Sequence, residues 1–282
     1  MPSFDTPEPI SATAHVEAGS LQFAASDRGE TVVEVRPRDP NKDVDARTAE
    51  QTEVTFANGA LTVRTPKSSL FGLGRTGVVD VTVDLPTGSH IDVTGAWAQV
   101  LGEGRLGDVR VKTSTGDVRL DTTGPLHLTA SHGSITVDRV EGRAEITTSS
   151  GSMRAGLLDG PAVLKNSHGS TIVDTATGEL RVSGANGDIQ IRRAEDSVTA
   201  TTAHGTLRVD SVCRGTVQLE TNHGTIDIGV REGTAAWLDA SSGRGQVRNA
   251  LTSSKIPGET EDTVRIRART RWGNIDIRRS KD

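Results

Sequence analysis

A glycine that opens a short alternating segment recurs at nearly constant spacing through most of this 282-residue chain. TSTGDVRL, ASHGSITV and TNHGTIDI are three such segments. The nine recurring glycines are Gly116, Gly133, Gly151, Gly169, Gly187, Gly205, Gly224, Gly245 and Gly273. Their spacing is 17 to 19 residues up to Gly224, followed by steps of 21 and 28. A fixed period of this kind is typical of a repeat protein in which each unit contacts only its neighbours.

Each repeat contains two pieces with alternating apolar residues, because a second series of turn residues runs half a period out of phase. Val118 and Leu120 form one apolar pair, and Val198 and Ala200 form another. Alternation with a period of two indicates strands with one buried face, whereas a helix would repeat its apolar residues at three and four. The pattern predicts an all-β chain that forms a parallel β-solenoid of about 18 residues per coil. Parallel crossovers favour right-handed coils.

The composition fits a narrow core. Apolar residues make up 33% of the chain and aromatic residues 2%, which is little for a compact globular core. A solenoid needs only a few inward residues per coil, and a column at Val140, Leu158, Ala176, Ala194 and Val212 predicts a buried corner. The recurring glycines are expected at turns, where positive φ is needed.

Residues 1–90 are more irregular and predict a β-rich cap on the solenoid of residues 91–282, which carries an insertion near 250–262. The segment FANGALTV predicts a hairpin at Asn-Gly. A short helix is expected after Asp39, with Asp39 as its N-cap and Pro40 at its first position. The glycine-rich SSLFGLGRTG lacks the spacing of a phosphate-binding loop.

Four arginines near the C-terminus, Arg265, Arg267, Arg269 and Arg271, stand at alternate positions and therefore share one face of a strand. One interpretation is a solvated, charged edge that prevents stacking of a second molecule. A second is a docking patch for an acidic partner or for lipid headgroups. A third is a polar interface in an oligomer.

Histidines recur directly before the turn glycines, at His132, His168, His204 and His223. Coils lie about 4.8 Å apart, so histidines two coils apart are too distant to share a metal ion. Only His204 and His223, in adjacent coils, could share one, and two histidines make a weak site. The row is interpreted as a turn preference or as a surface that senses pH or binds an anionic polymer.

No catalytic constellation is evident, and no cofactor is expected. Asp117 and Asp188 occupy equivalent positions four coils apart, too far to act as a carboxylate pair. Cys213 is the single cysteine, which excludes an internal disulfide. The net charge of -5 and the few aromatic residues argue against nucleic acid as a partner. The absence of a transmembrane run or signal peptide predicts a cytoplasmic protein.

The chain resembles a bacterial domain-of-unknown-function family described as putative adhesins with β-strand repeats. The resemblance rests on FDTPEPISATAHVEAGSLQFAASDRGETVVEVRP, VDLPTGSHIDV, the tandem repeats, GPAVLKNSHG, REGTAAWLDA and VRIRARTRWGNIDIRRS. It implies a β-solenoid and carries no catalytic residues.

These observations predict a non-enzymatic scaffold or binding module for a protein or envelope-associated partner, as a monomer or small homo-oligomer. The alternatives are a self-assembling, bactofilin-like structural protein and a carbohydrate-active β-helix enzyme.

Overall fold

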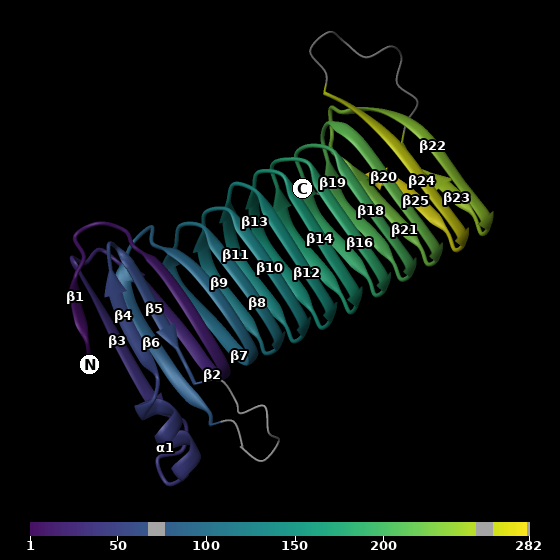
Figure 1. The fold of residues 1–282 in the computed structure, drawn as a ribbon. Helices are drawn as coiled ribbons and strands as arrows, with labels where there is room; N and C mark the ends of the chain where they lie inside the picture. Colours follow the sequence, from purple (N-terminus) through teal and green to yellow (C-terminus); the bar gives the residue numbers. More distant parts are fainter. Residues whose placement is uncertain (67–76, 252–261, 281–282) are drawn as a thin grey trace. The chain divides into compact units, whose positions relative to one another are not determined.

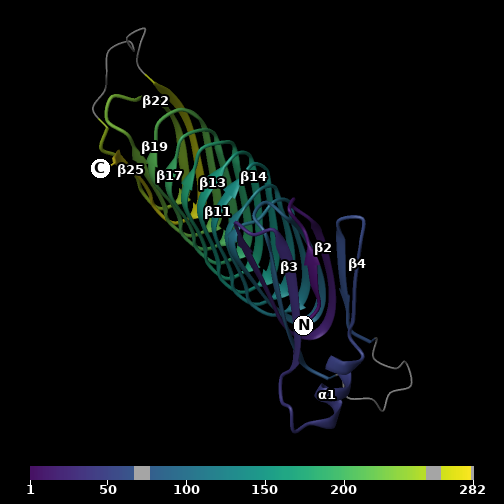
Figure 2. The same cartoon turned by 90° about the vertical axis from the view of Figure 1, so that its left-hand side faces the viewer.

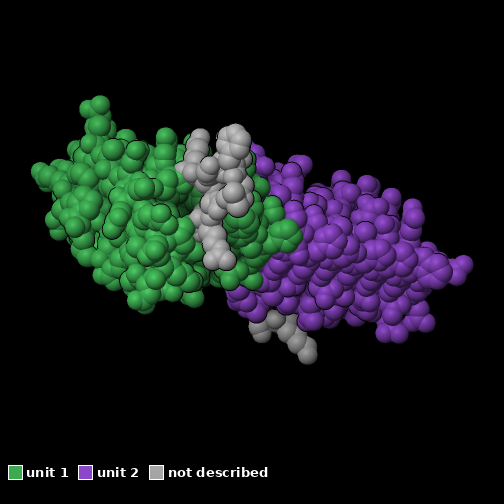
Figure 3. Space-filling model, turned by 60° about the horizontal axis from the view of Figure 1, so that its bottom comes forward, with its two compact units in different colours: residues 1–141 green, residues 142–282 purple. Residues whose placement is uncertain are grey.

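The computed structural model describes residues 1–66, 77–251 and 262–280, and it confirms the all-β solenoid. The chain divides into two compact units, residues 1–141 and 142–282, which Figure 3 colours separately. Most strands of each unit pair in parallel with a strand of a neighbouring coil (Figure 1). Residues 252–261, which hold most of the predicted insertion, and residues 67–76, which hold most of the glycine-rich segment, lie outside the described part of the chain.

The first unit combines a capping region with the first coils. Its elements are β1 (Ser3–Asp5), β2 (Ser11–Ser26), β3 (Glu30–Pro37), α1 (Asp43–Glu50), β4 (Glu53–Ala57), β5 (Ala60–Arg64), β6 (Val79–Pro86), β7 (His90–Arg105), β8 (Val109–Thr115), β9 (Val118–Thr123), β10 (Leu126–His132) and β11 (Ile135–Glu141). Both halves of β2 pair in parallel with β7, so β2 already forms a coil. Its other edge pairs with β5 and β6, which pair in turn with the antiparallel strands β4 and β3. The β4–β5 hairpin turns at Asn58 and Gly59, where φ is 51° and 73°.

Helix α1 begins later than the sequence predicts. Its N-cap is Lys42, without a side-chain cap, so the expectation that Asp39 caps the helix and Pro40 opens it is wrong. Asp39 forms a turn instead: its Oδ1 accepts from the amide of Asn41 at 3.0 Å, and its carbonyl accepts from the amide of Lys42 at 3.1 Å. The helix lies at the ends of β3 and β6 (Figure 2), where the buried Asp45 accepts the amide of Val78 at 2.9 Å.

The second unit contains the later coils. Its strands are β12 (Ala144–Ser150), β13 (Met153–Asp159), β14 (Ala162–His168), β15 (Thr171–Ala176), β16 (Leu180–Asn186), β17 (Ile189–Ala194), β18 (Val198–His204), β19 (Leu207–Val212), β20 (Gly215–His223), β21 (Ile226–Val230), β22 (Ala235–Arg244), β23 (Val247–Asn249), β24 (Thr263–Trp272) and β25 (Ile275–Arg279). The even-numbered strands from β12 to β20 pair in succession, and so do the odd-numbered strands from β13 to β21.

The last coil of the sequence is not the last coil of the stack. Strand β24 pairs with β20 on one side and with β22 on the other, and β25 lies between β21 and β23 (Figure 1). The interpretation of the arginine-rich strand as a charged edge is therefore wrong, since β24 has a neighbour on each side. The inward residues of the two coils account for the order, since Val264 of β24 stands in register with the smaller Ala236 of β22. Ile266 and Ile275 of the inserted coil are 0% exposed, whereas Leu238 is only half-buried and Val247 is 43% exposed in the terminal coil. Placing the more apolar coil between two neighbours buries more apolar surface.

The predicted corner column is confirmed: its five residues are at most 2% exposed. All nine recurring glycines adopt φ between 130° and 157°. Gly205 shows a second requirement besides φ. A Cβ at this position would lie 2.1 Å from the carbonyl oxygen of Gly187 in the neighbouring coil, so the stacked turns leave no room for a side chain.

A row of inward hydroxyl and amide groups supports these turns, and sequence reasoning missed it. Thr221 donates to the carbonyl of Gly205 at 3.3 Å, and Thr270 donates to that of Gly224 at 3.1 Å. Ser242 repeats the contact with Gly273 at 2.8 Å. Each group therefore binds the turn of the coil before it in the stack, which is the order β20, β24, β22.

Candidate functional site: an arginine strip on the terminal coils

The exposed arginines of β24 form a strip that is flanked by the neighbouring strands β20 and β22. Arg265, Arg267, Arg269 and Arg271 are all exposed, and their inward neighbours are buried. Arg265 stands in register with Thr216 on β20 and with Trp237 on β22. We call these four arginines the arginine strip. The sequence predicted their shared face, and the strand order supplies what lies on either side.

Carboxylates neutralise the middle of the strip. Asp239 Oδ2 lies 3.2 Å from Arg267 Nε and 3.6 Å from an amino nitrogen of Arg269. Glu220 on β20 stands in register with Arg269. Within the described residues Arg265 and Arg271 have no ion pair, and neutral residues stand in register beside Arg265. The two ends of the strip therefore carry cations that are available to a ligand.

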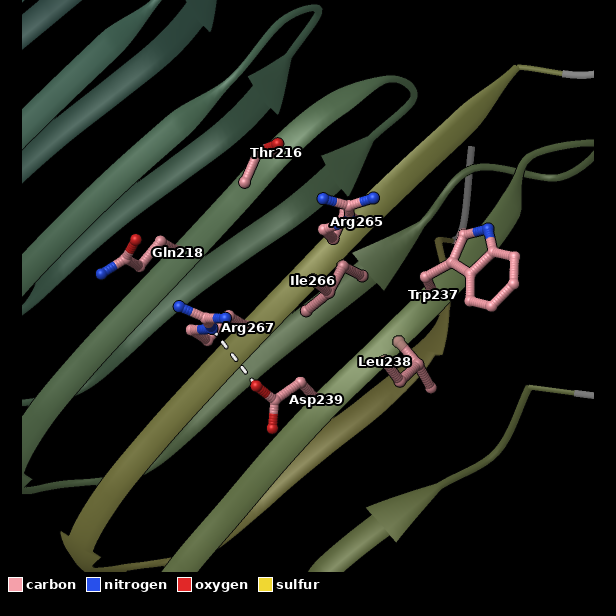
Figure 4. A pocket seen from close by; sticks show the side chains of 8 residues that line it. All are labelled: Thr216, Gln218, Trp237, Leu238, Asp239, Arg265, Ile266 and Arg267. Carbon is pink, nitrogen blue, oxygen red and sulfur yellow. Dashed lines mark hydrogen bonds and ion pairs between the residues drawn. The ribbon is translucent and has the colours of Figure 1, made fainter.

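A pocket of about 360 Å³ opens at one end of the strip. It is lined by Thr216, Gln218, Trp237, Leu238, Asp239, Arg265, Ile266 and Arg267 (Figure 4). The Trp237 side chain is 67% exposed and stands on the strand beside Arg265. Guanidinium, amide and indole groups together suit a ligand that carries a carboxylate beside an apolar or aromatic group.

The predicted histidine row is only partly brought together. His204 and His223 stack with ring centroids 4.7 Å apart and planes at 14°. His223 stacks in turn on Trp272 at 6.2 Å, and the guanidinium of Arg244 lies 4.2 Å from the Trp272 ring. His168 is separated from His204 by Asn186, and His132 belongs to the first unit, in register with Thr115.

The two stacked histidines face each other through their ring planes, which is a packing arrangement rather than a chelate. No group of three or more metal-ligating side chains occurs among residues 1–66, 77–251 and 262–280.

The first unit has a pocket of its own, of about 500 Å³. Its charged lining residues are Glu17, Arg64 and Lys112, and most of the rest are serine, threonine and small residues. Glu17 is the single carboxylate among the described residues that line this pocket, as Asp239 is in the other pocket. Glycoside hydrolysis in most families uses two carboxyl groups across the scissile bond. Neither pocket offers that pair.

Asp210 on β19 is engaged in an ion pair with Arg208. Burial raises the pKa of Asp210, but hydrogen bonds from Arg208 at 2.6 Å and Gln190 at 3.0 Å, with the charge of Arg208, outweigh burial and lower it. A general acid needs the opposite shift. Asp117 and Asp188 each accept a backbone amide from the adjacent coil, at 2.7 Å.

Sequence reasoning missed Trp237 as a surface residue. Trp237 is 67% exposed, and Trp97 of the first unit is 62% exposed. The available signal was alternation in AAWLDASS, which places Trp237 and Asp239 on one face. No helix in the described part of the chain has the length and hydropathy to cross a membrane.

Comparisons with known proteins identify one family over most of the chain. The family model described as Toastrack DUF4097 matches residues 16–278. A solved structure of a putative adhesin from Parabacteroides merdae is 16% identical, with 80% of this chain and 94% of that chain covered and a TM-score of 0.41. A putative adhesin from Parabacteroides distasonis is 13% identical, with 98% and 95% covered and a TM-score of 0.39.

A third structure, of a putative lipid binding protein from Parabacteroides distasonis, is 11% identical, with 99% and 96% covered and a TM-score of 0.34. No curated protein matches the chain.

Proposed function

We propose that this chain, which belongs to the Toastrack DUF4097 family, is a non-enzymatic binding module that holds an acidic segment of a partner protein along the arginine strip. The observation that carries the proposal is the pair of unneutralised cations at the ends of the strip. Arg265 and Arg271 are six residues apart in one strand, which is about 20 Å. Trp237 adds an exposed aromatic group beside the first of them.

The width of the strip favours an extended peptide over a membrane surface. Only one strand carries the arginines, and Glu220 and Asp239 stand on the strands to either side. These carboxylates would repel a planar anionic surface, whereas an extended chain can follow the arginines alone. Acidic side chains at alternate positions of an extended segment repeat every ~6.8 Å, the same period as the arginines.

Titration calorimetry with a decaglutamate peptide tests the proposal. The wild type is expected to bind, and the affinity falls as salt rises because the contacts are exposed ion pairs. The double variant Arg265→Ala with Arg271→Ala loses two exposed pairs worth about 0.5 kcal/mol each, so its Kd rises about fivefold. A matched control is Arg110→Ala with Arg119→Ala, since both arginines are exposed on strands of the first unit.

Equal affinities for the two double variants would refute the assignment of the strip. Vesicles of phosphatidylcholine with phosphatidylglycerol provide the second arm. Vesicle binding that is lost in the strip variant, without peptide binding by the wild type, would replace the acidic protein segment with a lipid surface.

A further inference from the structure

The outer edge of β22 is open among the described residues. β22 pairs with β24 on one side, and β23 pairs with β25 on one side. The amide of Ala235 donates to the carbonyl of Asp262, at 2.9 Å, on the β24 side. Because backbone groups alternate sides along a strand, Leu238, Ala240 and Ser242 direct their N–H and C=O groups away from β24. Such a row is a template for one more strand.

The same end of the solenoid exposes apolar side chains. Val247 is in register with Ile275, yet it is 43% exposed where Ile275 is 0%. Leu238 is half-buried beside the fully buried Ile266. The inward column therefore continues to the last coil and ends there without a covering layer among the described residues. Repeat proteins usually close such an end with a polar cap.

We propose that a second copy of this chain covers the edge, with its β22 antiparallel to the first and a two-fold axis at Ala240. Ala240 then faces Ala240 of the partner subunit as a hydrogen-bonded pair, in agreement with the outward direction of its backbone groups. Trp237 faces Gly243 of the partner subunit, so that the exposed indole covers an edge glycine, a pairing that stabilises strands. Asp239 faces Ser241 of the partner subunit, so no like charges stand opposite each other.

The strand supports a substantial contact. β22 has ten residues, and in this register its five outward-directed residues would form about ten hydrogen bonds with the partner subunit. The interface uses the same surface on both copies, so association closes at two and does not extend into a filament. The axis is perpendicular to the sheet, so each copy keeps its arginine strip on the same outer face. This pairing does not depend on the acidic ligand.

Sedimentation equilibrium of the full chain tests the pairing. The wild type is expected at twice the chain mass of 29.7 kDa, and Ala240→Pro at 29.7 kDa. Proline is suited to this position because the amide of residue 240 points away from β24, so its loss removes a donor to the partner subunit only. Far-UV circular dichroism must show the variant folded. A wild type that is monomeric at 100 µM, or a folded Ala240→Pro that stays dimeric, overturns the proposal.

Cysteine cross-linking tests the register and remains informative if the proline variant fails to fold. In a Cys213→Ser background, Ala240→Cys brings two thiols to the two-fold axis, with Cα atoms about 5.5 Å apart. Ala236→Cys is the matched control, because its two copies would lie about 27 Å apart. Oxidation should therefore join chains through position 240 and not through position 236. Equal cross-linking at the two positions would contradict the pairing.

Discussion

Replacing Gly205 by alanine tests whether the glycine row exists because the coils stack so closely. Gly205 has φ of 144°, and a Cβ there would lie 2.1 Å from the carbonyl oxygen of Gly187, where ordinary contact begins at 3.4 Å. The backbone conformation costs a non-glycine residue about 1–3 kcal/mol. Moving the neighbouring turn by more than an ångström adds an overpacking cost of about 1–3 kcal/mol. We expect Gly205→Ala to lower the free energy of unfolding by about 4 kcal/mol, as the sum of the two costs.

Gly233→Ala is the matched control, because Gly233 also has positive φ, 77°, but no atom of the described residues lies within 4 Å of its virtual Cβ. This variant should lower the free energy of unfolding by only about 1 kcal/mol, which is the cost of the left-handed conformation alone. Urea unfolding followed by circular dichroism measures both variants, provided that the slopes of the transitions agree. Equal losses for the two variants would refute the stacking argument and leave φ as the sole reason for the row.

Substitutions at two further positions test the polar contacts. Thr270→Val removes the hydroxyl that binds the carbonyl of Gly224 and should lower the free energy of unfolding in urea by about 1–3 kcal/mol. Thr270→Ser keeps the hydroxyl and should keep most of the stability. Equal losses for the two variants would contradict the role of the hydroxyl. Burial raises the pKa of Asp80, but hydrogen bonds from Arg38 and Ser20 and the charge of Arg38 outweigh burial and hold that pKa below 3.8. The stabilisation by ionised Asp80 is therefore present above the unfolded-state pKa and is lost as pH falls through the lower folded-state pKa. Asp80→Asn should lower the unfolding midpoint at pH 7, and this deficit should shrink as the pH falls through the acid range. A deficit that keeps its size as the pH falls would contradict this linkage.

Much of the fold follows from local patterns. The alternation of Val198 and Ala200 predicts the strand and its buried face, and the constant spacing of the glycines predicts parallel coils in register. The corner column follows from the same period. These features depend on residues close in sequence, or on equivalent residues one period apart, and a repeat displays both directly.

The order of the last coils could not be predicted in the same way. Strand β24 follows β22 in sequence, yet it lies between β20 and β22. The coil at the end of the stack is decided by how much apolar surface each coil would bury. The repeat period carries no information on that difference. The small inward residues of AAWLDASS in β22, against the inward Val264 and Ile266 of β24, were the signal that β22 suits the end of the stack better.

The residues of the candidate site were also predicted only in part, for the same reason. The alternate spacing of Arg265 and Arg271 predicted a shared face, because it is a property of one strand. Trp237 and Asp239 join that face only because β22 lies beside β24, so their part in the pocket depended on the strand order. The start of α1 was missed for another reason: Asp39 binds its own turn, which competes with helix capping.

The position of β24 inside the stack is the claim on which the arginine strip, its pocket and the open edge of β22 all depend. Disulfide formation tests it directly in a Cys213→Ser background. Gln218→Cys with Arg267→Cys joins residues in register on adjacent strands, whose Cα atoms are about 4.8 Å apart. Gln218→Cys with Asp239→Cys joins strands separated by β24, about 9.6 Å apart and beyond the reach of a disulfide. The account predicts an intramolecular disulfide in the first variant and none in the second; a disulfide between positions 218 and 239 would show that the coils stack in sequence order and would contradict it.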